Sequence, residues 1–113
     1  DGDIAVCFRE WLESGTCPKA LVTTHASATA VVCRELKEHG LSCPKDFSLI
    51  TFDNSVENVF GLELTHLHVY PRELGVKSAQ RLYQIMTSGG KDTTPYKIVL
   101  PLELVVGNSV RNA

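Results

Sequence analysis

The chain has 113 residues, of which 43% are hydrophobic and 21% charged, a balance typical of one globular domain or part of one. Its formal net charge is −2 and no basic run occurs, which argues against a nucleic-acid-binding surface on this segment. No apolar stretch approaches the roughly 20 residues that a membrane-spanning helix needs. The sequence has no initiator methionine and no signal-peptide pattern, and it opens within a helical pattern, so we expect a piece of a longer protein.

The cysteines and histidines show no metal-site or disulfide pattern. His66 and His68 would share one face of a strand, but no third ligand has a suitable spacing. The four cysteines form no CxxC pair, and free thiols in a reducing cytoplasm are the expectation for all of them: Cys7, Cys17, Cys33 and Cys43. The sequence therefore predicts no metal and no cofactor.

Hydrophobic periodicity predicts helices and strands in alternation. Helical spacing marks three segments, β-branched runs mark the strands, and Pro71 suits the first position of the last helix. Strands separated by helices indicate an α/β fold with a mostly parallel sheet and flanking helices. The predicted elements are helix 3–14, strand 20–24, helix 26–39, strand 48–52, a short polar turn or helix at 55–61, strand 66–70, helix 71–88 and two short strands within 97–106 around Pro101.

One strand ends at a carboxylate. Gly40 supplies a helix C-cap and Pro44 blocks the continuation of that helix, so the mostly apolar run 47–52 begins a new element. Asp53 follows at its carboxyl end, the edge at which open α/β sheets bind ligands. This position makes Asp53 the first candidate for a ligand-binding residue.

Five motifs occur in order over about residues 16–109. They are His39-Gly-Leu-Ser-Cys-Pro-Lys-Asp46, Thr51-Phe-Asp-Asn54, Leu64-Thr-His66, Glu73-Leu-Gly75 and Leu100-Pro-Leu-Glu-Leu-Val-Val106. Together they resemble the C-terminal part of sugar-responsive repressors of the lactose/galactose repressor (LacI/GalR) family. That family has a helix ending Arg-Gly-Leu-x-Val-Pro-x-Asp, a strand ending Gly-Phe-Asp-Asp, a Leu-Thr-Thr-Val strand, a Glu-Leu-Gly helix and a final Leu-x-x-Glu-Leu-Val-x-Arg-x-Ser.

The resemblance implies a two-lobed effector domain of the periplasmic-binding-protein-like type, with its ligand between the lobes. About residues 1–68 and 101–113 would belong to the C-terminal lobe, and the segment at about 71–100 to the other lobe. The family's DNA-binding domain would lie upstream of this segment. The long helix at 71–88 would then pack against something other than the C-terminal lobe.

The resemblance also implies ligand contacts. The family's first aspartate after the Phe binds sugar hydroxyls and matches Asp53, whose alternative is to cap the turn at 54–57. The Asn of the family's Asn-Asp pair also contacts the ligand, and His25 occupies its position. A histidine there can donate or accept one hydrogen bond, whereas an amide offers a paired donor and acceptor. The alternative is that His25 is only the first residue of a helix, with no ligand role. Phe52 fills the core or lines the pocket wall. Ser27, His25 and Asp53 supply the residue types of a hydrolase triad without its GxSxG elbow, so we expect no catalytic residue and no enzyme.

In the same family the C-terminal lobes pair through the helix after the Asn-Asp motif and the segment after Phe-Asp-Asp. Here these are about residues 26–39 and 55–62, which predicts a homodimer interface. The helix would present one flank, distinct from its core side chains Val32 and Leu36, and the turn would add apolar residues or tuck Phe60 under its own loop. The predicted interface residues are Ala30, Cys33, Arg34, Val59, Phe60 and Leu62.

Two function classes fit. The first is the ligand-sensing and dimerisation domain of a cytoplasmic transcriptional regulator, which binds a small-molecule effector such as a sugar and reaches operator DNA only through an upstream domain. The alternative is a sugar-binding protein of a transport system with the same fold. The run from Pro44 to Asn54 and four unpaired cysteines favour the regulator.

Overall fold

The computed structural model describes residues 2–54, 58–59 and 61–112. The chain forms two compact units. The sheet unit consists of Asp1–His68 and Glu103–Ala113, and the helical unit of Val69–Leu102. The chain passes between them twice, after His68 and before Glu103.

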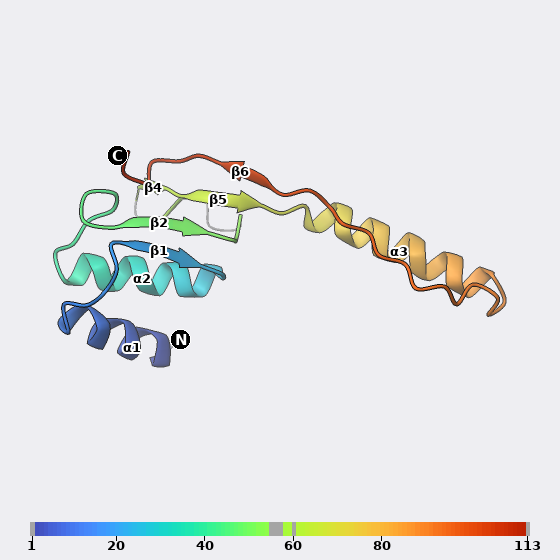
Figure 1. Cartoon of the computed structure of the whole chain (residues 1–113), viewed down its shortest axis with the longest axis horizontal. Helices are drawn as coiled ribbons and strands as arrows, with labels where there is room; N and C mark the ends of the chain where they lie inside the picture. The colour runs from blue at the N-terminus through green and yellow to red at the C-terminus, as the bar shows by residue number, and fades with distance from the viewer. Residues whose placement is uncertain (1, 55–57, 60, 113) are drawn as a thin grey trace. The chain divides into compact units, whose positions relative to one another are not determined.

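A four-stranded sheet in the order β1-β2-β5-β6 organises the sheet unit (Figure 1). The first three strands are parallel and β6 is antiparallel to β5, which confirms the predicted mostly parallel α/β architecture. Crossovers between the parallel strands run through a helix or a hairpin, because parallel neighbours cannot be joined by a tight turn. The strands are β1 (Ala20–Thr23), β2 (Ser48–Thr51), β5 (Thr65–His68) and β6 (Glu103–Val105).

Helices α1 (Gly2–Glu13) and α2 (Ala26–Glu38) share one core with the sheet. The predicted helices 3–14 and 26–39 are thus confirmed. The opposite face of the sheet carries exposed apolar side chains such as Val22 and Phe52. The buried core cluster consists of Phe8, Val32, Cys33, Leu36, Phe47, Leu49 and Leu64.

The end of α2 follows from its sequence. Gly40 has φ +69°, a left-handed conformation that favours glycine. The Gly40 N–H donates to Lys37 O at 3.1 Å and the Leu41 N–H to Leu36 O at 2.9 Å, the two bonds of a Schellman motif. The predicted glycine C-cap is therefore confirmed.

The segment between β2 and β5 differs from the helical alternative predicted for 55–61. Strands β3 (Asn58–Val59) and β4 (Leu62–Glu63) pair antiparallel in a small hairpin (Figure 1). Gly61, with φ +80°, lies in the turn. Short polar stretches allow a turn or one helical turn, and pairing between Val59 and Leu62 selects the hairpin.

The chain after β6 seals the sheet unit through Ser109. Its hydroxyl donates to Leu49 O at 2.6 Å and accepts the Thr65 N–H at 2.8 Å, so it bridges β2 and β5. Gly107 approaches the backbone of Glu63 so closely that a Cβ at this position would lie 2.2 Å from the Glu63 carbonyl oxygen. The C-terminal segment therefore belongs to the fold of this unit.

The helical unit contains α3 (Pro71–Thr87) and an extended return segment. Arg81 forms a bidentate ion pair with Asp92, and its guanidinium lies 5.1 Å from the ring centroid of Tyr96. Of the two strands predicted within 97–106, only β6 forms, and residues 97–102 form no strand. The prediction was wrong there because a strand needs a hydrogen-bonded neighbour, and β5 offers one only to Glu103–Val105.

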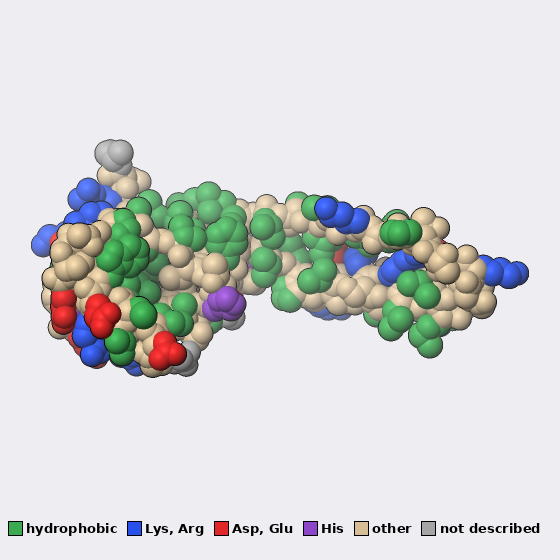
Figure 2. Space-filling view, turned by 60° about the horizontal axis from the view of Figure 1, so that its bottom comes forward, with side chains coloured by type: hydrophobic (Ala, Val, Ile, Leu, Met, Phe, Trp, Pro, Cys, Tyr) green, Lys and Arg blue, Asp and Glu red, His purple; other side chains and the backbone are tan. Residues whose placement is uncertain are grey.

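Helix α3 buries none of its residues in this chain. Figure 2 shows hydrophobic side chains along the surface of the helical unit. The exposed apolar residues of α3 are Leu74, Val76, Leu82, Tyr83, Ile85 and Met86. Within the described residues, no helix combines the length and apolar character needed to span a membrane.

Candidate functional site

The register of the parallel strands brings the predicted ligand residues to one edge. Thr23, Thr51 and His66 lie side by side on β1, β2 and β5. Because side chains alternate between the two faces of a strand, the next positions related to this row are His25 and Asp53, at the carboxyl edge of the sheet. Both predicted residues therefore stand at the edge where open α/β sheets bind ligands.

The same register adds a residue that the sequence analysis did not assign to the site. His68 ends β5 two positions beyond His66 and pairs across the antiparallel ladder with Glu103. It is partly buried, and its ring centroid lies 6.2 Å from that of His66. The sequence alone could not place it, because the register of β2 against β5 is a tertiary property.

Asp53 holds the start of helix α2. Its Oδ2 accepts the backbone N–H of Ala26 at 2.8 Å, and the side chain is partly buried. The N-terminus of a helix carries unsatisfied N–H groups and a partial positive charge, both of which stabilise a carboxylate. Asp53 thus has a structural role across the strand–helix junction. The predicted alternative of capping the turn at 54–57 involves residues 55–57, which lie outside the described residues.

His25 is the N-cap residue of α2, with extended backbone at φ −141° and ψ 149°. Its side chain makes no capping hydrogen bond and is exposed. Nδ1 lies 2.8 Å from the Thr24 hydroxyl. A hydroxyl can donate or accept, so the ring can take either tautomer and Nε2 can present a donor or an acceptor to a ligand.

Three threonine hydroxyls form a hydrogen-bonded cluster that reaches the backbone of His25. The Thr29 hydroxyl lies 2.7 Å from that of Thr23 and 3.2 Å from that of Thr51, and it donates to the His25 carbonyl at 2.9 Å. Thr29 and Thr51 are both fully buried. These three residues come from α2, β1 and β2, so the cluster joins the three elements that carry the site.

Phe52, predicted to fill the core or to line a pocket wall, is 45% exposed. The core alternative is wrong, because Phe52 points away from the face that α1 and α2 cover. Trp11 on α1 is also exposed at the surface of this chain.

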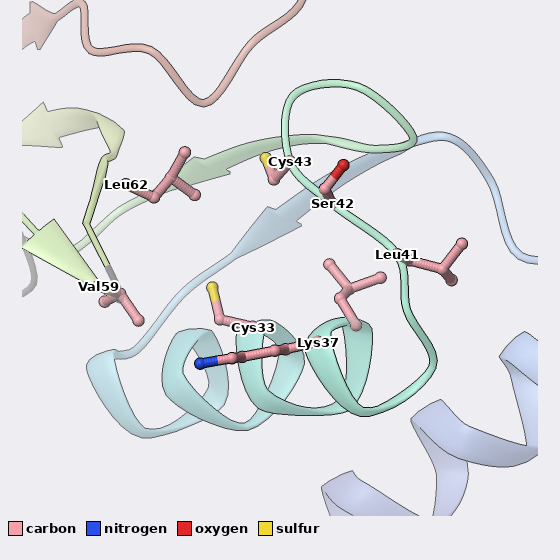
Figure 3. Close-up of a pocket in the computed structure, with 8 residues that line it drawn as sticks. Cys33, Lys37, Leu41, Ser42, Cys43, Val59 and Leu62 are labelled. Atoms are coloured by element: carbon pink, nitrogen blue, oxygen red, sulfur yellow. The ribbon is translucent and has the colours of Figure 1, made fainter.

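The side of the sheet unit that carries the predicted dimer-interface residues contains a cavity. A cavity of about 190 Å³ lies between α2, the loop after it and the β3–β4 hairpin. Figure 3 shows Cys33 and Lys37 on α2, Leu41 to Cys43 in the loop, and Val59 and Leu62 around this hollow. Its wall contains none of the candidate ligand residues His25, Phe52 and Asp53.

The interface candidates divide into three groups. Ala30 and Arg34 are exposed on α2, as an interface flank requires, whereas Val59 and Leu62 are partly buried and pack against the core. Cys33 was predicted on the same flank, but it is 8% exposed and belongs to the core cluster, so its separation from Val32 and Leu36 was wrong. Residues one position apart on a helix lie 100° apart, and the core-facing side of α2 is broad enough to include both. Phe60 lies outside the described residues.

The buried thiol of Cys33 and the partly buried thiol of Cys43 are poorly suited to redox or metal chemistry. All four cysteines are free. Burial raises the pKa of Cys33 to about 11, and burial also raises the pKa of Cys43, so both thiols stay protonated at neutral pH. Within the part of the chain that the structure describes, no three His, Cys, Asp or Glu side chains are grouped to hold a metal ion.

Comparison with known proteins decides the family. Residues 3–110 match the family model described as the periplasmic binding protein-like domain. The chain belongs to this family. Open α/β sheets commonly bind ligands at the carboxyl edge of their strands, and His25 and Asp53 lie at this edge.

The proteins to which this chain is similar include transcriptional repressors. It is 37% identical over 78 residues to the HTH-type transcriptional repressor PurR of Actinobacillus pleuropneumoniae serotype 3 (strain JL03), covering 68% of this chain and 23% of that protein. The fold matches the lac repressor dimer bound to operator and the anti-inducer ONPF, with a TM-score of 0.79 and 23% identity over 95% of this chain and 37% of the other. It also matches the transcription regulator CcpA of Lactococcus lactis, with a TM-score of 0.81 and 20% identity over 97% and 40%.

These matches confirm the resemblance to repressors of the LacI type that the sequence motifs indicated. The two solved structures show the fold alone, since their identities are low. The chain spans about a quarter of the length of the curated relative that it matches.

Proposed function

We propose that this chain is the ligand-sensing part of a transcriptional regulator, which binds a small-molecule effector and controls DNA binding by a domain outside it. The observation that carries the proposal is the placement of Asp53 and His25 together at the carboxyl edge of the sheet, in a periplasmic-binding-protein-like domain. The repressor relatives favour a regulator over the alternative, a sugar-binding protein of a transport system, and with it a cytoplasmic location. We propose no enzymatic role and no cofactor.

The chemistry of the edge favours a ligand rich in hydrogen-bond donors. Asp53 uses Oδ2 for the Ala26 N–H, and a carboxylate has acceptor capacity beyond one such bond. A sugar offers hydroxyls that donate to a carboxylate through charge-assisted bonds, about twice as strong as neutral ones. His25 then accepts from or donates to a neighbouring hydroxyl according to its tautomer. Phe52, exposed at the end of β2, would offer an aromatic wall to the ligand.

We further propose that the helical unit is part of a second lobe. Seventeen residues of α3 bury no side chain, and its exposed apolar residues include Leu82, Tyr83 and Met86. A helix with such a surface is stable in water only when another element covers it. We propose that the remaining part of a longer polypeptide supplies that element, and that the segment at about 71–100 belongs to the other lobe.

The cavity between α2 and the β3–β4 hairpin (Figure 3) supports a homodimer interface on the sheet unit. Its lining is apolar apart from Lys37 and Ser42, and Ala30 and Arg34 lie on the exposed side of the same helix. Small side chains such as Ala30 let two helices approach closely. A second copy of the chain is the occupant that we propose, because two DNA-binding heads need a fixed spacing to read a palindromic operator.

A thermal-shift panel tests the proposed function. The full-length polypeptide is heated with individual monosaccharides and with nucleobases at millimolar concentration. A ligand that binds only the folded state raises the melting temperature, so at least one sugar is expected to do so. A panel in which no sugar raises the melting temperature contradicts the sugar class, and a response to nucleobases alone replaces it with planar nitrogen heterocycles.

A further inference from the structure

Thr29, a fully buried residue of helix α2, is hydrogen-bonded to the backbone of the candidate site residue His25. Its Oγ donates to the carbonyl oxygen of His25 at 2.9 Å. Asp53 accepts the N–H of Ala26 at 2.8 Å. These two groups belong to the same peptide unit, the one that joins His25 to Ala26.

A trans peptide unit is planar, with its C=O and N–H pointing in opposite directions. Thr29 therefore holds one side of the His25–Ala26 plane and Asp53 holds the other. Rotation of that plane would break both bonds. The His25 carbonyl also accepts the backbone N–H of Thr29 at 3.0 Å, so the buried hydroxyl adds a second bond on this side of the plane. Without the hydroxyl, the backbone bond alone would hold that side against Asp53 on the other.

The donor and acceptor roles within the threonine cluster follow from the bond between Thr29 and the His25 carbonyl. A hydroxyl has one proton to donate and two lone pairs. If Thr29 donates to the His25 carbonyl, its two lone pairs accept from Thr23 at 2.7 Å and from Thr51 at 3.2 Å. The Thr29 hydroxyl is then fully satisfied. The Thr23 proton has a second acceptor within reach, the Ile50 carbonyl at 3.5 Å, and the shorter contact to Thr29 is the better bond.

We propose that Thr29 is a positioning residue for the effector site, acting through the His25–Ala26 peptide to hold Asp53 and His25 in their binding geometry. The proposal rests on the proposed function for its consequence in ligand binding. The geometry itself is testable without a ligand. Thr29 is fully buried, so it orients the site without touching the effector.

The decisive variants are Thr29→Val, which replaces the hydroxyl by a methyl group of similar size, and Thr29→Ser, which keeps the hydroxyl. Thr51→Val is the matched control, because it removes an equally buried hydroxyl whose bond goes to Thr29 and not to the His25–Ala26 peptide. In the full-length polypeptide, the chemical shift and the hydrogen exchange of the Ala26 amide report the bond to Asp53. Asp53→Ala gives the reference signal for its loss.

In Thr29→Val we expect the Ala26 amide shift to move toward that of Asp53→Ala and its exchange to accelerate by about tenfold, the scale of losing a hydrogen bond to a charged group. Thr29→Ser and Thr51→Val should keep the wild-type amide signal. An unchanged Ala26 amide in Thr29→Val, or the same change in Thr51→Val, would overturn the positioning role. If Thr29→Val does not fold, Thr29→Ser decides, because loss of the Ala26 signal with the hydroxyl present refutes the proposal and its retention supports it.

The same variants enter the monosaccharide and nucleobase panel in the full-length polypeptide. Thr29→Val should lose most of the ligand-induced rise in melting temperature, while Thr51→Val keeps it. A wild-type response retained in full by Thr29→Val contradicts the functional part of the proposal. A panel without any wild-type response counts against the proposed function instead, and the Ala26 amide still decides whether Thr29 positions the peptide.

Discussion

The Asp53 carboxylate caps helix α2 from the end of the neighbouring strand, with Oδ2 2.8 Å from the backbone nitrogen of Ala26. His25, the N-cap residue itself, makes no side-chain capping bond. The helix therefore takes its cap from a residue 27 positions further along the chain. One carboxylate serves both the fold and the candidate ligand site, which means that its removal affects two measurable properties.

Asp53→Ala should abolish the effector response of the full-length polypeptide and also lower its stability. Loss of a helix cap costs about 0.5–2 kcal/mol, so the free energy of unfolding should fall by about that amount. Chemical denaturation gives the stability and the thermal-shift panel gives the response.

Asp53→Asn is the matched control for this prediction. Its side-chain carbonyl can still accept the Ala26 N–H, but it offers a neutral acceptor to the ligand. We expect near-wild-type stability with a weakened response. Ligand affinity at the wild-type level in either variant would remove Asp53 from the binding site.

His25→Asn should shift the ligand profile toward common monosaccharides. An amide supplies a donor and an acceptor in one plane, whereas a neutral imidazole whose Nδ1 bonds Thr24 has only Nε2 left. The panel of sugars, run on both proteins, measures the change. Identical profiles would show that His25 acts only as the first residue of the helix.

The sequence predicted most of the fold because its strong signals are local. The Gly40 cap, Pro44 and the periodicity of α1 and α2 are properties of neighbouring residues, and all three helices form where the periodicity placed them. The β3–β4 hairpin and the missing strand at 97–102 depend on which segments find a partner. Pairing of that kind is not encoded in a single stretch of sequence.

The candidate site was predictable in part for the same reason. Asp53 follows a buried strand, a position visible in the sequence, and a resemblance placed His25 beside it. The bonding of Thr29 and the place of His68 come from helix packing and strand register, and no local pattern in the sequence indicates either of them. The burial of Cys33 was missed because the core-facing side of α2 is wider than the spacing of Val32 and Leu36 suggested.

Gly107→Ala should destabilise the sheet unit. A Cβ at residue 107 would lie 2.2 Å from the Glu63 carbonyl oxygen, and backbone on both sides must move to accept it. Overpacking of this kind costs about 1–3 kcal/mol, measured by chemical denaturation. Gly2→Ala, where no atom lies within 4 Å of the added Cβ, is the control and should change stability little. Equal stability of the two variants would show that the Gly107 segment is not part of the folded unit.

The ion pair between buried Glu35 and the half-exposed Arg9 should make stability depend on acid pH. Glu35 is 1% exposed, and Arg9 Nε and Nη2 lie 3.0 and 3.1 Å from its oxygens. The hydrogen bond from Arg9 lowers the pKa of Glu35 below its usual value of about 4.3. The folded state therefore gains stability from this group above about pH 4.3, and it loses that gain as the pH falls through the lowered pKa.

Glu35→Gln tests this pH dependence. Denaturation midpoints measured from about pH 6 to pH 3 should fall for the wild type and fall less steeply for Glu35→Gln, which starts lower at neutral pH. Arg34→Gln is the control, since its Nη2 lies 3.8 Å from Glu35 and the side chain is half exposed. If the denaturation midpoint of Glu35→Gln falls as steeply at acid pH as that of the wild type, the pH dependence belongs to other carboxylates.

Ala30→Arg should convert the dimer to a monomer while leaving the fold intact. Ala30 is exposed on α2, so a longer side chain meets only solvent in one copy. In the proposed interface it would place a bulky charge next to Arg34 and between two closely packed helices, where an unpaired charge is costly. Sedimentation of the full-length polypeptide should show a dimer for the wild type and a monomer for the variant, with matching circular dichroism spectra. Glu13→Arg, an exposed charge change on α1, should remain a dimer. A dimeric Ala30→Arg would place the interface elsewhere, and a monomeric wild type at high concentration would refute the dimer.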